Sequence, residues 1–351
     1  MWRLTFLTGI EVNEMKILKN EIKLCPSCME DHNVDIVEVM EHVSFKGVEV
    51  KFSASYEHCA NSDEYFANED MIRANNLAVK DAYREMVGLL TSKEIVGLRE
   101  KYGVSQKDFA EILDWGMATI TRYENHQIQD RAHDDILRKI GADPQWFIEI
   151  LKRAKGRLSP KAFDYYYHTA SAQYRKQKNQ YLISSIQAIY ADLDKEESTG
   201  FMELNLDKVV AAINYIAQQV SDLYKVKLMK LLWYSDALHF KRYGRSITGL
   251  AYCALPMGAV PEGHEQIMML EGVSYEVLLY ENVAYKFLPT PGFEFQCLTD
   301  DELQVIDKII SEFGTLSTSQ IVEKMHDEEA YKCTDSRCII PYSFAARLSI
   351  D

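Results

Sequence analysis

Three cysteines near the N-terminus have the type and spacing needed to bind zinc. Cys25 and Cys28 form a C-x-x-C pair, whose two thiolates can reach one ion, and Cys59 is a third candidate. A structural zinc site needs four ligands. The candidates for the fourth ligand are His58, Asp63 and His42. The sequence therefore leaves two alternatives: a closed, structural zinc site, or a domain that keeps the fold of a zinc finger but binds no metal.

The segment from Ser105 to Glu124 has the pattern of two short helices joined by a tight turn, which is typical of DNA-binding units. Ala110 is small enough for the helices to cross closely, and Asp114 tolerates a left-handed backbone in the turn. The inward positions are Phe109, Leu113, Ile120 and Tyr123. The residues predicted to bind DNA are Gln106, Met117, Ala118, Thr119, Thr121 and Arg122. Among them, Thr121 and Arg122 are expected to contact bases or phosphates, while Gln106 and Thr119 position the second helix. An ordinary helical hairpin is the alternative.

A strongly apolar stretch from Lys227 to Phe240 has more aromatic residues than one buried helix face needs. We expect it to be core, or to leave an aromatic surface for a partner protein. The candidate contact residues are Trp233, Tyr234, His239 and Phe240.

Catalysis is the weaker interpretation of the remaining polar residues. His239, His264 and His326 have acidic neighbours in Asp236, Glu265 and Asp327, but none forms HExxH, a nucleophile elbow or a phosphate loop. Cys333 and Cys338 could share a metal with outside ligands, although two inert thiols are the simpler interpretation. The sequence therefore predicts a protein that is not an enzyme.

Composition limits the class of protein further. The formal net charge of -14 argues against non-specific coating of nucleic acid, so any DNA contact must be local. Basic residues are in excess over residues 152–181, which fits either a DNA backbone contact or a solvated face. We expect a cytoplasmic protein with reduced cysteines, because the apolar N-terminus is too short for a signal peptide and no run is long enough to span a membrane. Met15 is an alternative start.

The patterns predict a mainly α fold with a small N-terminal β region, an α+β multidomain chain. Helices are expected from Asn68 to about Ile150, at 206–219, 225–243, 300–313 and 318–325, and extended pieces at 275–287 and 293–297. A charged stretch at 192–200 is the expected linker. The predicted domains are an extension (1–20), a zinc-finger-like β domain (21–70), a helix-turn-helix domain (71–150), a basic helix and linker (151–203) and a helical C-terminal domain (204–351).

Three segments resemble known families. Residues 95–140, with Gly103-Val104-Ser105-Gln106 and Thr119-Ile120-Thr121-Arg122-Tyr123-Glu124, resemble the DNA-binding domains of phage-repressor-like, xenobiotic-response-element regulators. The cysteine region resembles the N-terminal zinc domain of the MqsA class of antitoxins. In that class a second C-x-x-C pair closes the site; here the pair would be Cys59 and position 62, which is Ser62. Residues 204–342 resemble the Panacea domain, also called SocA-like or GepA-like. The motifs are Lys227-Leu228-Met229-Lys230-Leu231-Leu232-Trp233-Tyr234 and Gly258-Ala259-Val260-Pro261-Glu262, where Ala259 replaces the family's usual proline.

Together these resemblances imply an antitoxin of a type II toxin-antitoxin pair. It would hold a protein toxin through its C-terminal domain and repress its own operator DNA, and we expect a homodimer because one recognition helix reads few base pairs. Two alternatives remain: a stand-alone regulator carried by a phage or mobile element, and a proteolytic adaptor. A toxin-like gene directly beside this one would favour the antitoxin.

Overall fold

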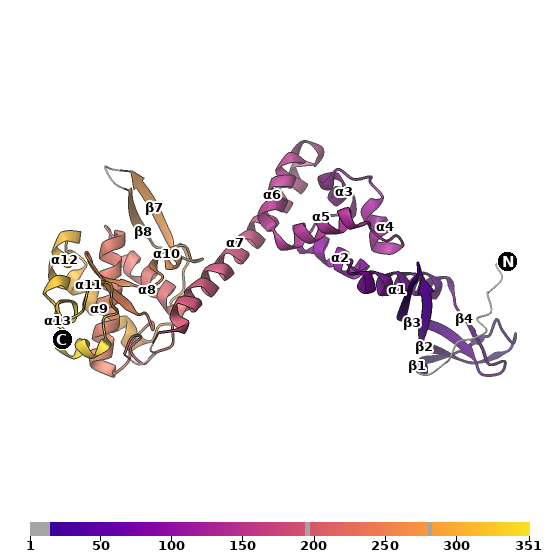
Figure 1. The fold of residues 1–351 in the computed structure, drawn as a ribbon, viewed down its shortest axis with the longest axis horizontal. Coiled ribbons are helices and arrows are strands. Elements are labelled where there is room, and N and C mark those ends of the chain that lie inside the picture. Colours follow the sequence, from indigo (N-terminus) through magenta and orange to yellow (C-terminus); the bar gives the residue numbers. More distant parts are fainter. Residues whose placement is uncertain (1–14, 194–196, 280–282) are drawn as a thin grey trace. The chain divides into compact units, whose positions relative to one another are not determined.

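The computed structural model describes residues 15–193, 197–279 and 283–351 and divides into two compact units. The first unit ends at Tyr174 and the second begins at Arg175. The chain is mainly helical, with a small antiparallel sheet near its N-terminus, which confirms the predicted α+β class (Figure 1). No helix among the described residues is long and apolar enough to cross a lipid bilayer.

The first unit opens with a four-stranded antiparallel sheet in the order β1-β2-β3-β4. The strands are β1 (Met15–Leu24), β2 (Asp31–Phe45), β3 (Val48–Cys59) and β4 (Glu64–Phe66). Lys46 and Gly47 join β2 to β3 with φ angles of 51° and 78°, the positive values that a tight two-residue hairpin turn requires. Residues 15–20, predicted as part of an extension, instead pair with β2. The predicted extension before Met15 lies outside the described residues.

Helix α1 (Glu69–Val87) packs along β3 and begins at the N-cap Asn68, as its periodicity predicts. The Asn75 side chain accepts a hydrogen bond from the Ser55 backbone nitrogen at 2.8 Å and donates one to the Ser55 carbonyl at 2.9 Å. Tyr83 meets the Phe45 ring edge-on at 5.5 Å between centroids. These contacts join α1 to the strand that ends in Cys59.

A bundle of short helices follows and has its own apolar core. Its members are α2 (Ser92–Lys101), α3 (Gln106–Leu113), α4 (Thr119–Asn125), α5 (Arg131–Ala142), α6 (Pro144–Arg153) and the 3-10 turn Lys155–Arg157. Of the residues predicted to face inward, Phe109, Ile120 and Tyr123 are buried and Leu113 is half-buried; Ala110, predicted at the helix crossing, is fully buried. Asp114 ends α3 with φ 58° and ψ 37°, the left-handed backbone predicted for it.

Arg84 fixes α1 to the end of α4. Its guanidinium is fully buried and donates to the carbonyl oxygens of Tyr123 at 2.8 Å and Gln127 at 2.6 Å. It also donates to the side chains of Gln129 at 3.0 Å and Asp81 at 2.5 Å. A buried charge is tolerated where its donors are satisfied, as they are here. The same helix therefore supports the sheet at one end and α4 at the other.

Helix α7 (Pro160–Ala191) contributes its first half to the first unit and its second half to the second. The boundary between the units falls inside it, whereas the linker is predicted at 192–200, a stretch that lies partly outside the described residues. In the first unit, the Tyr166 hydroxyl donates to Asp108 of α3 at 2.6 Å. Gly103 has φ 66°, and a Cβ there would lie 2.7 Å from the Tyr165 hydroxyl, so this turn requires glycine.

The second unit is built around α9 (Lys225–Tyr243), which is buried along almost its whole length. The surrounding helices are α8 (Leu206–Gln219), α10 (His264–Ile267), α11 (Asp300–Phe313), α12 (Thr318–Asp327), α13 (Glu329–Lys332) and the 3-10 turn Tyr342–Arg347. The predicted bounds of α8, α9 and α11 are confirmed, and α12 extends two residues beyond its prediction.

Two hairpins complete the second unit: β5 (Tyr252–Leu255) with β6 (Gly258–Pro261), and β7 (Ser274–Leu279) with β8 (Val283–Leu288). The extended region predicted at 275–287 corresponds to β7 and β8. The extended piece predicted at 293–297 is wrong, because this segment forms turns and carries no strand. The β5–β6 hairpin was not predicted.

Candidate functional site

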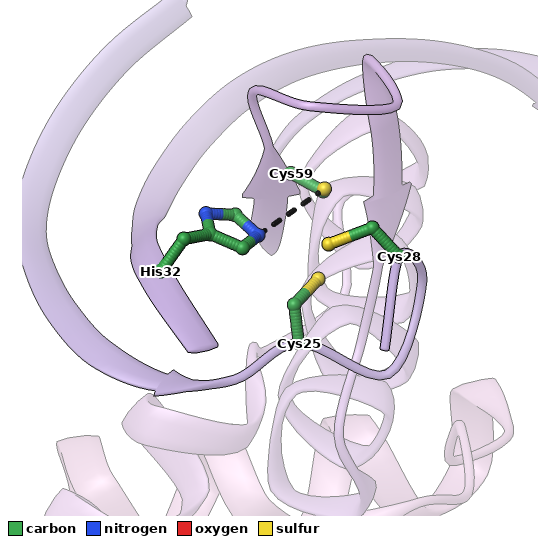
Figure 2. Close-up of side chains that lie close together, drawn as sticks. All are labelled: Cys25, Cys28, His32 and Cys59. Carbon is green, nitrogen blue, oxygen red and sulfur yellow. Dashed lines mark hydrogen bonds between the residues drawn. The ribbon is translucent and has the colours of Figure 1, made fainter. Parts of the chain in front are cut away.

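Four side chains at one end of the sheet point toward a common centre: Cys25, Cys28, His32 and Cys59 (Figure 2). Their ligand atoms all lie within 4.8 Å of one another, and His32 Nε2 is 3.4 Å from Cys59 Sγ. Zinc bound tetrahedrally at about 2.3 Å from sulfur and roughly 2.0 Å from nitrogen places its ligand atoms about 3.5 to 3.8 Å apart. The three thiols and one imidazole therefore fit a zinc ion in number, type and spacing.

The first two ligands come from a turn between β1 and β2. The Cys25 backbone nitrogen donates to the Glu30 carbonyl at 2.9 Å, and the Met29 nitrogen donates to the Cys25 carbonyl at 2.8 Å. This folding brings both sulfurs to the same side. Met29 adopts φ 62°, a left-handed conformation that costs a residue with a side chain about 1 kcal/mol or more. The turn therefore stores a small local strain next to the site.

The fourth side chain of the cluster is His32, which the sequence does not predict. Its Nδ1 lies 2.8 Å from the Asn33 carbonyl, so a proton on Nδ1 leaves Nε2 free to face the sulfurs. A signal for it was present, because alternate residues of a strand share one face. His32 lies two positions before buried Val34, which packs with Cys25 and Cys59.

The three ligands considered from the sequence do not complete the site. His58 Nε2 instead contacts an Asp63 carboxylate oxygen at 2.9 Å, and both lie outside the four-residue cluster. His42 is exposed farther along β2, opposite Lys51. A histidine next to Cys59 in a strand must point to the opposite face, which explains why His58 is excluded.

The second turn of the site resembles the first, although it supplies one ligand instead of two. Met29 follows the first turn and Asp63 follows the second, and both have positive φ, 62° and 53°. Ser62 occupies the position where a second cysteine would lie, and its hydroxyl is 2.6 Å from that of Ser27. The side chain of Ser62 thus joins the two turns, while His32 supplies the remaining ligand atom.

The electrostatic environment lowers the pKa of two of the three cysteines. Burial raises the pKa of Cys25, but hydrogen bonds from the backbone of Cys28 and Ser27 outweigh it, and the pKa is lowered. A hydrogen bond from the Ser62 side chain is the main cause that lowers the pKa of Cys59 to about 6, against the opposing effect of burial. The pKa of His32 is raised, chiefly by its hydrogen bond with Cys25. Burial raises the pKa of Cys28. Zinc binds cysteine as thiolate and histidine as the neutral ring, so metal binding would release protons here. With four protein ligands the site has no open position, which is typical of a structural centre.

The residues predicted to bind DNA lie on or beside α4, with different exposures. Met117, Ala118 and Arg122 are exposed, whereas Thr119 and Thr121 are half-buried. Arg122 thus lies free on the surface of α4, and Met117 and Ala118 precede the helix in the turn from α3. Whether these residues bind DNA stays a prediction.

Gln106 and Thr121 belong to a network that holds α3 against α4. The Thr121 hydroxyl donates to the side-chain oxygen Oε1 of Gln106 at 2.9 Å, and the side-chain nitrogen Nε2 of Gln106 donates to the Glu124 carboxylate at 2.5 Å. Glu124 is buried and also accepts from Arg99 of α2 at 2.7 Å. Gln106 therefore has the bracing geometry expected of it. Thr121 shares that role, because its hydroxyl proton is already donated within the protein.

The aromatic residues predicted to bind a partner through α9 require a correction. Trp233, Tyr234 and His239 are 3%, 0% and 2% exposed, and only Phe240 is half-buried. Tyr234 stacks near Phe313 of α11 at 4.3 Å between ring centroids, and Phe240 contacts Tyr342 of the C-terminal segment at 5.4 Å. Trp233, Tyr234 and His239 are therefore core and present no surface to a partner, while Phe240 is only partly accessible.

The acidic neighbours of the histidines do not assemble into a second site. Asp236 is fully buried, and its carboxylate accepts from the Ile247 and Thr248 nitrogens at 2.8 and 2.9 Å and from the Thr248 and Tyr252 hydroxyls at 2.6 Å each. Burial, opposed by these hydrogen bonds, raises its pKa to about 6. Among the described residues, the cluster around Cys25 is the only group of metal-binding side chains that converges. Cys333 and Cys338 are exposed free thiols.

This architecture defines a structural class before any comparison: a mainly helical protein of two units, with a possible metal site on the sheet of the first. Comparison with protein families then matches residues 228–332 to the family described as Antitoxin SocA-like, Panacea domain. The matched region begins in α9 and ends with α13. Comparison with curated proteins and with solved structures finds no match to this chain.

Proposed function

We propose that this protein is the antitoxin of a toxin-antitoxin pair, which binds its toxin through the second unit and its own operator DNA through α4. The observation that carries the antitoxin role is the match of residues 228–332 to the SocA-like antitoxin domain. We infer a binding protein in the cytoplasm, not an enzyme, with zinc as a structural ion in the first unit. A homodimer would place two copies of α4 on successive major grooves.

The antitoxin role can be tested with the full-length protein and the product of the reading frame that adjoins its gene. We expect that product to arrest growth when expressed alone, and co-expression of this protein to restore growth. The two proteins should also co-purify as a stable complex. An adjoining product that is harmless and does not bind would contradict the antitoxin role and would favour a stand-alone regulator.

DNA binding is proposed from the arrangement of α3 and α4. The network of Gln106, Thr121 and Glu124 fixes the angle between the helices, and Arg122 is exposed with no acidic side chain paired to it among the ion pairs of the described residues. Such a side chain can reach a guanine edge or a phosphate. The helix pair resembles a helix-turn-helix unit in which α4 would enter the major groove.

Replacing Arg122 with Ala should weaken binding to the upstream region of the gene by about 1 to 3 kcal/mol if Arg122 contacts a guanine. Fluorescence anisotropy with duplexes from that region measures the change. Arg73→Ala is a matched control, because Arg73 is an exposed arginine on α1. Equal affinities for the Arg122 variant and the parent protein would refute the assignment of α4 as the reading helix.

A further inference from the structure

The β7–β8 hairpin carries an unbroken apolar face along its whole described length. Three cross-strand pairs lie on this face because they are two residues apart along each strand: Tyr275 with Phe287, Val277 with Tyr285, and Leu279 with Val283. All six side chains are aliphatic or aromatic. The opposite face is mixed and includes the pair Glu276 and Lys286.

The two ends of this face have different environments. At the base, Phe287 is 1% exposed within the core, and Tyr275 and Tyr285 pack against it. Toward the tip, Val277 is 53%, Leu279 81% and Val283 54% exposed. Figure 1 shows the hairpin extending outward from the helices of the second unit. The base holds the hairpin in place, since an isolated two-stranded hairpin is at best marginally stable. The tip therefore presents a contiguous aliphatic surface in a fixed position.

The exposed charge on the hairpin strands is acidic. Glu276 is exposed on β7, whereas Lys286, its cross-strand partner on β8, is joined to Asp222 at 3.0 Å. Each copy of the chain has a net charge of -14. Like charges at an interface oppose association, whereas a basic rim on a different protein would be attracted.

We propose that the tip formed by Val277, Leu279 and Val283 is the docking surface for a partner protein that has an apolar pocket with a basic rim. The inference rests on the proposed function and names the surface through which the second unit would hold the toxin. Exposed aliphatic patches on soluble proteins commonly mark partner sites, and a few central side chains supply most of the affinity. This proposal assigns the partner contact to the hairpin tip instead of to the buried aromatic residues of α9.

The decisive experiment compares two full-length double variants for binding to the product of the adjoining reading frame. Leu279→Ser with Val283→Ser removes the aliphatic tip, and we expect affinity to fall about 100-fold by calorimetric titration. Met257→Ser with Met269→Ser is the matched control, since these methionines are 48% and 46% exposed elsewhere in the same unit. The control should bind like the parent protein, and both variants should keep the parent's circular dichroism. Unchanged binding by the hairpin variant, or an equal loss in the control, overturns the proposal.

A charge variant tests the basic rim separately. Glu276→Lys should weaken the complex several-fold and reduce its dependence on salt, whereas Glu323→Lys, an exposed site on α12, should not. If the hairpin variant instead changes only the oligomeric state in sedimentation velocity, the surface joins two copies and the proposal is wrong. If the unaltered protein fails to bind the adjoining product, the proposed function fails, and the docking assignment is overturned with it. If the unaltered protein binds the adjoining product and only the hairpin variant loses binding, both the proposed function and the docking assignment are supported.

Discussion

The N-terminal sheet and the C-terminal unit are stabilised in different ways. The metal end of the sheet has a core of only four buried apolar residues, and two of these are the cysteines Cys25 and Cys59. The C-terminal unit surrounds α9 with a continuous core drawn from its helices and hairpins. A small sheet that cannot bury enough apolar surface commonly depends on a metal or disulfide. We therefore expect metal binding to stabilise the sheet and apolar burial to stabilise the C-terminal unit.

The polar groups of the two regions show the same contrast. In the C-terminal unit the buried carboxylate of Asp236 receives four hydrogen bonds from its own unit. In the sheet the three thiols and His32 face one another around a common centre. A metal ion would bind all four at once. Hydrogen bonds within the chain thus match the buried carboxylate in one region, and a bound ion would join the four ligand atoms in the other.

Removal of the metal should have the largest effect. We expect purified protein to hold one zinc per chain, and chelation to unfold the sheet while α9 and its neighbours stay folded. Structural zinc sites in small domains contribute on the order of 10 kcal/mol. His32→Ala should reproduce the loss, and His42→Ala, on the same strand but exposed, should not. Elemental analysis measures the zinc content of the parent and variants, and two-dimensional NMR shows whether the sheet is folded. Substoichiometric zinc in a fully folded sheet would show that the metal-free alternative is correct.

Asp236→Ala should have the next largest effect, confined to the C-terminal unit. The substitution leaves the two backbone nitrogens and the hydroxyls of Thr248 and Tyr252 without their acceptor, and each buried donor left unsatisfied costs about 1 to 3 kcal/mol. Urea denaturation followed by tryptophan fluorescence measures the loss, and Asp335→Ala is an exposed control. Zinc content should not change. A fall in zinc content in the Asp236 variant would break the proposed independence of the two regions.

A smaller effect concerns the pH dependence of the C-terminal unit. Lys230 is fully buried, and burial lowers its pKa to about 7, while Nζ donates to the Ala259 carbonyl at 2.8 Å. An unfolded lysine has a pKa of about 10.4, so between these values the unfolded chain binds more protons and stability rises with pH. This contribution is complete above the unfolded pKa and is lost as pH falls toward 7.

Lys230→Met should remove this rise in the free energy of unfolding with pH, because methionine fills a similar volume without a charge. Denaturation midpoints at pH 7 and pH 9.5 give the test. We expect the parent protein to gain stability over this interval and the variant to gain less, with equal or greater stability at pH 7. A variant with the parent's slope would show that another group titrates.

The sequence predicts helices better than it predicts the contacts between distant segments. The bounds of α8 and α9 follow from apolar periodicity and from ends at Asn205 and Gly244, all of which are local. The left-handed turn at Asp114 is local as well. The β5–β6 hairpin has no alternation to reveal it, because Tyr252, Cys253 and Ala254 are all buried.

The two site errors have the same cause. By local pattern the aromatic residues of α9 exceed what one buried face needs, since nothing local shows that Tyr342, Leu348 and Ile350 return from the end of the chain to cover that helix. His32 has no spacing motif that marks it as a ligand, because it lies in a strand and outside both cysteine turns. In the folded sheet His32, which lies on β2 opposite Lys23 of β1, completes the cluster. Both errors depend on tertiary contacts that pattern and spacing do not contain.

Helix α1 links the metal centre to the proposed DNA-reading helix. Asn75 attaches one end to the strand of Cys59, and Arg84 attaches the other to the last carbonyls of α4. Two binding events that act on one helix are thermodynamically reciprocal. If zinc strengthens operator binding by some factor, operator DNA must strengthen zinc binding by that same factor. The protein would then lose its metal most readily when it is away from its operator.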